Sequence, residues 1–185
     1  RLENNPVAQQ QAYEDGQLQP FEHGRPLWMQ GFIMNTRRAP LDNALVREVL
    51  ITSFDFGWVN TSLMGGQARQ VNSLFTGTSL SANIPLPGEG ASQRQRIRMA
   101  SDLLDEAGYP LRDGTRFTLG LILNDGAQEK IALYWAQSLK RLGITLDIRT
   151  LDTAQFVGAL NEYDYDLVSH RWVNSLSPGT EQMLY

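Results

Sequence analysis

Three carboxylates alternate with two tyrosines near the end of the chain, and paired carboxylates are common residues of general acid and base catalysis. They are Glu162, Asp164 and Asp166. The same residues also suit a junction between a helix and a strand, where polar side chains normally face solvent. We interpret them first as such a junction, and a hydrolase of peptides or esters that uses Asp164, Asp166 or His170 is kept as an alternative.

Other signatures of enzyme chemistry are missing from the sequence. The chain has no cysteine, and its two histidines, His23 and His170, lie in different segments without a partner four residues away. This pattern disfavours thiol chemistry and a histidine metal site. The sequence has no G-x-S-x-G motif, and Gly88-Glu89-Gly90 lacks the third glycine of a dinucleotide-binding fingerprint. We therefore expect no enzyme activity, no cofactor and no metal site.

The residues from Trp172 onward combine an aromatic ring with hydrogen-bonding groups. Trp172 ends a predicted strand, and Asn174 and Ser175 follow it closely. A flat apolar surface beside polar groups suits a ligand cleft, whereas a core tryptophan followed by a turn is the alternative. Trp28 and Gln30 allow the same two interpretations.

The first part of the chain changes from irregular to regular structure. Three prolines in residues 1–26 predict an irregular lead-in, and the apolar run over 27–36 predicts a buried strand. Asp42 is expected to cap a helix that Gly57 ends, and a second short helix is expected over 58–64.

A long loop is predicted next, followed by a well-marked helix. Residues 67–91 lose all periodicity and contain many glycines and prolines, which is typical of loops. Ser92 and Gln95 have the spacing of a capping box, and Gly108 is placed to end the helix that follows.

The second half alternates strands and helices. Strands are predicted over 117–123, 144–148 and 166–173, the first helix between them ends at Gly143, and Asp152 caps the second. This order implies parallel pairing with right-handed crossovers, and therefore an α/β lobe with helices packed on a sheet. Ligands of such sheets bind beyond the carboxyl ends of the strands, which indicates residues 172–179 above all.

Composition excludes two further classes of function. The chain has 185 residues, a net charge of -4 and a sequence pI near 5.2. A nucleic-acid-binding surface normally carries an excess of lysine and arginine, which this chain lacks. No apolar run approaches the roughly 20 residues of a membrane-spanning helix. We expect a soluble globular domain that binds no nucleic acid; its acidic surface leaves a protein-interaction module as a further alternative.

Several motifs, in order along the chain, resemble family 5 of the extracellular solute-binding proteins. They are GFIMNTRRAPLD at 31–42, SFDFGWVN at 53–60, LLDEAGY at 103–109 and LSPGTEQ at 176–182. The second and fourth look specifically like the YejA-like branch, whose members are associated with peptides and peptide-like compounds.

The resemblance implies a fold, a location and partners. The fold would be a type II periplasmic-binding-protein lobe, with a mixed, mainly parallel sheet flanked by helices. Residues 27–185 would be the C-terminal lobe of a two-lobed protein, lacking a longer segment that the family usually carries between Pro87 and Gly88. The protein would bind a peptide or peptide-like ligand between this lobe and an absent N-terminal lobe, in the periplasm or anchored outside a membrane. It would deliver the ligand unchanged to the permease subunits of an ABC importer.

The resemblance also implies roles for residues near the last strand. In family members the strand that ends at the tryptophan matching Trp172 runs beside the bound peptide, so the main chains of Arg171 and Val173 are candidates to bind it. An aspartate that commonly pairs with the ligand ammonium is replaced by Ser175. Arg171 stands where glycine is frequent, and its guanidinium is a candidate partner for a ligand carboxylate. The predicted ligand-binding set is Trp172, Arg171, Val173, Asn174, Ser175, Trp28 and Gln30.

Overall fold

A computed structural model describes residues 11–19, 28–73, 75–76, 78–82 and 84–173. The chain forms two compact units. One unit comprises Arg1–Met29, Phe56–Asn83 and Val173–Tyr185, and the other comprises Gln30–Asp55 and Ile84–Trp172. The second unit contains the sheet and most of the helices.

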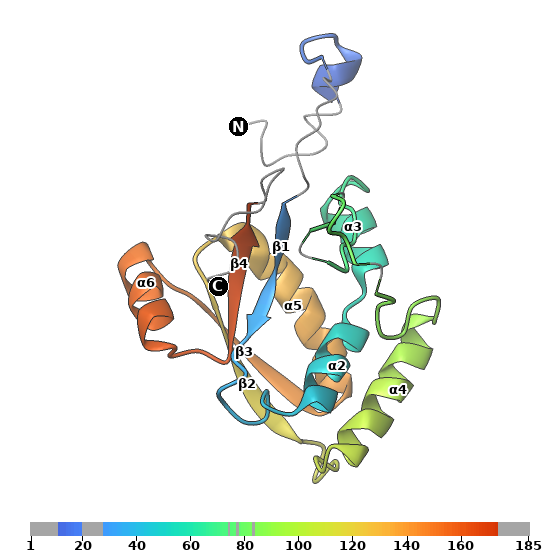
Figure 1. The fold of residues 1–185 in the computed structure, drawn as a ribbon, viewed down its shortest axis with the longest axis vertical. Coiled ribbons are helices and arrows are strands. Elements are labelled where there is room, and N and C mark those ends of the chain that lie inside the picture. The colour runs from blue at the N-terminus through green and yellow to red at the C-terminus, as the bar shows by residue number, and fades with distance from the viewer. Residues whose placement is uncertain (1–10, 20–27, 74, 77, 83, 174–185) are drawn as a thin grey trace. The chain divides into compact units, whose positions relative to one another are not determined.

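The sheet of the second unit has four strands in the order β1, β4, β2, β3. They are β1 (Met29–Met34), β4 (Leu167–Trp172), β2 (Phe117–Leu123) and β3 (Ile144–Thr150). β2 pairs in parallel with both β3 and β4. β1 runs in the opposite direction to β4 (Figure 1). The sheet is therefore mixed and mainly parallel, which confirms the predicted class.

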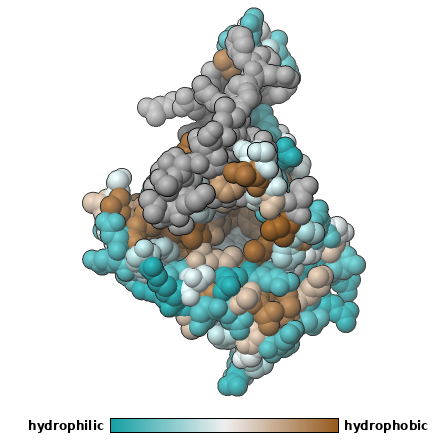
Figure 2. Space-filling view, viewed as in Figure 1, coloured by the Kyte–Doolittle hydropathy of each residue, from teal (hydrophilic) through white to brown (hydrophobic). Residues whose placement is uncertain are grey.

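Helices pack on both faces of this sheet. One face carries α2 (Ala44–Ser53), α4 (Gln93–Glu106) and α5 (Gly126–Arg141), and the other carries α6 (Thr153–Glu162) (Figure 1). Alternate strand residues separate into two cores, since neighbouring side chains point to opposite faces. The exposed side of α4 is mainly hydrophilic (Figure 2).

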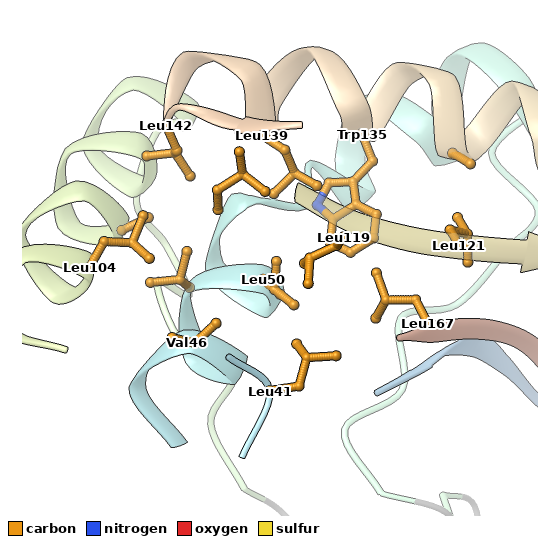
Figure 3. Packing of buried hydrophobic residues seen from close by; sticks show 14 of the residues in the cluster. Leu41, Val46, Leu50, Leu104, Leu119, Leu121, Trp135, Leu139, Leu142 and Leu167 are labelled. Carbon is orange, nitrogen blue, oxygen red and sulfur yellow. The ribbon is translucent and has the colours of Figure 1, made fainter. Parts of the chain in front are cut away.

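The larger core lies between the sheet and α2, α4 and α5. The ring of Trp135 lies close to Leu119 and Leu50 (Figure 3). Phe32 stacks on Trp135 with ring centroids 5.6 Å apart, and Phe54 meets it edge-on at 6.1 Å. Aromatic pairs of this kind add to the stability that burial alone provides.

The smaller core lies under α6. It consists of Ile122, Phe156, Tyr165 and Val168. Phe156 is the buried residue of α6, and Asp152 caps that helix by accepting a hydrogen bond from the backbone N–H of Gln155 at 2.9 Å. The predicted cap of this helix is thus confirmed.

The first unit contains α3 (Phe56–Leu63) and a series of turns. Asn60 fixes the chain after α3, since its side chain donates to Ala68 O at 2.8 Å and accepts from Ala68 N at 2.9 Å. The described residues of 67–91 form turns and bends without a helix or strand. Residues 11–14 are helical, within the segment that we predicted to be irregular.

Two details of the predicted helices are wrong. The N-cap of α2 is Asn43, one residue after the predicted Asp42, because the Asn43 side chain accepts from Leu45 N at 2.9 Å. Gly57 does not end this helix. α2 ends at the extended residue Phe54, and Gly57 lies inside α3.

Candidate functional site

The carboxyl ends of three strands meet at one edge of the sheet. Leu123 and Thr150, which end β2 and β3, are direct partners in the parallel register. β4 extends further, since Ile122 pairs with Val168 while the strand continues to Trp172. The end of β4 therefore projects past its neighbour β2 at the edge where α/β sheets bind ligands.

The two cores reveal which face each residue at the end of β4 occupies. Leu167 belongs to the core under α5, and Val168 belongs to the core under α6. Alternation along the strand then places Arg171 on the α5 face, and His170 and Trp172 on the α6 face. Arg171 is exposed, while His170 and Trp172 are half-buried.

The rings of His170 and Trp172 contact each other on the α6 face. Their centroids are 4.7 Å apart and their planes meet at 76°, which is an edge-to-face arrangement. Burial lowers the pKa of His170 below its ordinary value of 6.5, because the neutral ring loses less by leaving water than the cation does. The structure thus pairs the imidazole of His170 with the tryptophan predicted to bind ligand.

β1 brings Gln30 to the same end of the sheet. The backbone N–H of Asn35 donates to Asp166 O at 2.8 Å, so counting along these antiparallel strands places Gln30 level with Arg171. Phe32, two residues after Gln30, packs in the core under α5. Gln30 therefore lies on the face that Arg171 occupies.

The hydrogen bond between Asn35 and Asp166 also indicates the direction of the main-chain N–H and C=O groups of Arg171. The carbonyl of Asp166 faces β1, and main-chain groups of consecutive strand residues point alternately to the two neighbouring strands. The N–H and C=O of Arg171 consequently point to the β2 side, at a level past the last residue of β2, Leu123. This direction is the one that pairing with an added strand requires.

The predicted ligand-binding residues are only partly brought together. Gln30, Arg171 and Trp172 lie at one end of the second unit, although Trp172 is on the opposite face from the other two. Trp28 and Val173 belong to the first unit, where their side chains are 48% and 72% exposed. Asn174 and Ser175 lie outside the described residues.

His170 was not among the predicted ligand-binding residues. The signal that places it beside Trp172 is the spacing of two between His170 and Trp172 in a strand, because such residues share a face. The same alternation separates Arg171 from Trp172, which the sequence prediction had grouped as neighbours.

The carboxylates considered for catalysis lie at the opposite end of β4, in a structural network. Arg38 binds Asp164 at 2.9 Å and lies 3.9 Å from Asp166. Asp166 Oδ2 accepts a hydrogen bond from the backbone N–H of Gly120 at 2.8 Å. His170 is four residues further along the strand, about 13 Å away at the usual rise. The structure therefore separates His170 from the two aspartates named with it in the alternative hydrolase, and it engages both aspartates with Arg38.

An asparagine and a cation over a ring complete this network. Asn35 Nδ2 donates to the carbonyls of Tyr163 and Tyr165 at 3.1 and 3.0 Å. The Arg37 guanidinium lies 3.7 Å from the centroid of the Tyr163 ring. Burial, with a smaller effect from Tyr163, raises the pKa of Tyr165 above 10.0. These contacts hold the loop after β1 to the start of β4, as expected for a junction.

The described residues contain neither a cluster suited to a metal ion nor a helix suited to a membrane. Among them, no three histidine or acidic side chains are grouped so as to hold a metal ion. None of the helices in the described segments has the length and apolar character needed to cross a bilayer.

Residues 2–185 match the family model for bacterial extracellular solute-binding proteins, family 5, middle region. The chain belongs to this family. Among the relatives of this family 5 chain, BMEII0691 of Brucella melitensis is 33% identical over 99% of the chain and 37% of its own length. The peptidoglycan-binding protein YepA of Agrobacterium fabrum is 29% identical over 88% of the chain and 32% of its own length. The family 5 chain thus spans about a third of these relatives.

Solved structures agree on the fold of the family 5 chain. The murein tripeptide binding protein MppA of Escherichia coli has a TM-score of 0.72 at 23% identity, over 84% of this chain and 31% of MppA. The oligopeptide-binding protein AppA of Bacillus subtilis, solved with a nonapeptide, has a TM-score of 0.69 at 20% identity, over 84% of this chain and 33% of AppA. The family 5 chain therefore has the α/β fold of type II periplasmic binding proteins, which confirms the fold that the sequence implied. This family and this fold are those of binding proteins.

Proposed function

We propose that this chain forms one wall of the ligand site in a longer peptide-binding protein. The protein captures a peptide or peptide-like compound between this lobe, the C-terminal one, and a second lobe. It then delivers the ligand to the permease subunits of an ABC importer, with no reaction and no cofactor. Such a protein acts in the periplasm or anchored on the outer side of a membrane.

The observation that carries the proposal is the end of β4. Trp172 is the last residue of the central strand β4, at the edge where three parallel strands end. Its side chain is half-buried, and its ring contacts the ring of His170. A large ring held in this position provides an apolar contact, and the main chain of Arg171 points where an extended ligand can pair with it. Main-chain pairing tolerates many sequences because every peptide has the same backbone.

Charge at this end favours one part of the ligand. Arg171 is exposed on the α5 face, and guanidinium groups bind carboxylates in a bidentate manner. The position where related receptors carry an aspartate for the ligand ammonium is Ser175. We therefore propose that Arg171 pairs with a ligand carboxylate, and that this lobe does not bind a free peptide amino group through an ion pair at position 175.

Calorimetry on the longer protein that contains this chain tests the proposal. The ligands are a mixed pentapeptide library and a murein tripeptide, because the names of AppA, YepA and MppA point to these two classes. We expect Trp172→Ala to weaken binding at least tenfold, since truncating a buried aromatic contact commonly costs 2 kcal/mol or more. Leu133→Ala, at an exposed apolar position on α5, is the matched control and leaves affinity unchanged.

Other outcomes distinguish the alternatives. Unchanged affinity in both Trp172→Ala and Arg171→Met would remove the end of β4 from the ligand site. Mass spectrometry of the peptides after incubation separates binding from hydrolysis, because a hydrolase shortens them. A stable complex with another soluble protein, without peptide binding, would favour an interaction module instead.

A further inference from the structure

The two faces at the end of β4 offer different chemistry. Arg171 and Gln30 provide a cation and an amide on the α5 face, and Trp172 with His170 provides aromatic rings on the α6 face. The plane of the sheet separates these two groups. One ligand residue therefore cannot contact both of them with a single side chain.

A ligand that extends alongside β4 has the same alternation of side chains. The ligand residue level with Arg171 directs its side chain to the α5 face, because directly opposite residues of paired strands share a face. The next ligand residue is level with Trp172 if the ligand runs parallel to β4, or with His170 if it runs antiparallel on that side. Both of these positions are on the α6 face, so the result does not depend on the direction of the ligand.

Resting on the proposed function, we infer that this site selects peptides in which an acidic residue is directly adjacent to an apolar or aromatic residue. The carboxylate binds Arg171 through charge-assisted hydrogen bonds, and the neighbouring side chain packs on the contacting rings of Trp172 and His170. If one residue separates the two groups in the ligand, both point to the same face, and only one of them reaches its partner.

Three pentapeptides with amidated carboxyl termini test this inference by calorimetry on the longer protein. Ala-Ala-Glu-Phe-Ala has the two groups adjacent, Ala-Glu-Ala-Phe-Ala separates them by one residue, and Ala-Ala-Gln-Phe-Ala removes the charge. Amidation leaves the glutamate as the sole carboxylate of the first two peptides and leaves the third with none. We expect the first peptide to bind at least tenfold more tightly than either of the others.

Variants assign each preference to a side chain. Arg171→Met abolishes the preference for glutamate over glutamine. Trp172→Ala abolishes the preference for the peptide with adjacent groups over the peptide with separated groups. Arg98→Met on α4 and Leu133→Ala on α5, both at exposed positions, leave these ratios unchanged.

Different results would overturn the inference and the proposed function. Equal affinities for the adjacent and separated peptides would overturn the inference while peptide binding itself stands. A glutamate preference that persists in Arg171→Met would overturn it as well. If neither these peptides nor the mixed library binds to the folded protein, the proposed function itself is wrong.

Discussion

Ser53 lies where α2, α4 and α5 meet, and both its hydroxyl and its backbone carbonyl make hydrogen bonds. Its Oγ accepts a hydrogen bond from Trp135 Nε1 and donates to Leu50 O, both at 3.0 Å. Its backbone carbonyl accepts from Gln93 Nε2 at 3.1 Å. The residue is fully buried, so water cannot replace these bonds. A small hydroxyl thus satisfies the polar edge of the largest ring in the core.

Replacing this hydroxyl tests the network. We expect Ser53→Ala to lower the free energy of unfolding by about 1–3 kcal/mol, because the Trp135 N–H is left buried without an acceptor. Urea unfolding followed by circular dichroism measures the change. Ser79→Ala, at an exposed position, is the control and stays within about 0.5 kcal/mol of wild type. Equal stability of the two variants would contradict the assignment.

Gly143 joins α5 to β3 with a positive φ of 75°. A Cβ built there would lie 2.4 Å from Leu111 Cδ1 and 3.2 Å from the carbonyl oxygen of Gly114. The backbone conformation therefore favours glycine, and the Gly114 carbonyl leaves little room for a Cβ. The junction sets where β3 begins, and β3 is the outer parallel strand of the sheet.

A pair of glycine substitutions tests this junction. Gly143→Ala is expected to destabilise the protein by more than about 1 kcal/mol, because alanine is strained at positive φ and crowds the neighbouring atoms. Gly126→Ala, at the first residue of α5 with open space around it, is the matched control and is neutral or slightly stabilising. Thermal unfolding of both variants measures the difference, and a tolerated Gly143→Ala would show that the junction can rearrange.

Structural features that depend on residues within one helix or its ends were predictable from the sequence. The capping box of Ser92 and Gln95 is present, and Gly108 and Gly143 have the positive φ expected after a helix. Neighbouring candidates for one role were harder to separate. Asp42 and Asn43 are both good N-caps, and only the observed hydrogen bond to Leu45 distinguishes them.

The packing of one element against another was harder to predict from the sequence. The alternation of a strand separates Arg171 from Trp172, but the sequence does not say which helix covers which face. That information comes from Leu167 and Val168, which pack in different cores. The Arg38 and Asp164 ion pair joins residues 126 positions apart, and single-sequence reasoning gives no pairing over such a separation.

At the scale of the molecule, the two ends of the sheet differ in chemistry. Asn35, Arg38 and Asp166 bind one another and the backbone at the amino end of β4. At the carboxyl end, Arg171 is exposed and Trp172 is half-buried. We propose that this second end faces the ligand site of a longer protein. The contacts of Asn35, Arg38 and Asp166 thus hold β4 in place, and the proposed ligand-binding residues Arg171 and Trp172 lie at the other end of this strand.

Amide hydrogen exchange in the longer protein, with and without the mixed pentapeptide library, tests the proposed ligand wall most directly. Because Arg171 and Val173 lie at the end of β4, beside the path proposed for the ligand, bound peptide is expected to slow the exchange of both amides several-fold. The amides of Tyr163 and Asp166, at the other end of the junction and strand, are expected to keep their rates. Saturating peptide that leaves Arg171 and Val173 unchanged would contradict the account.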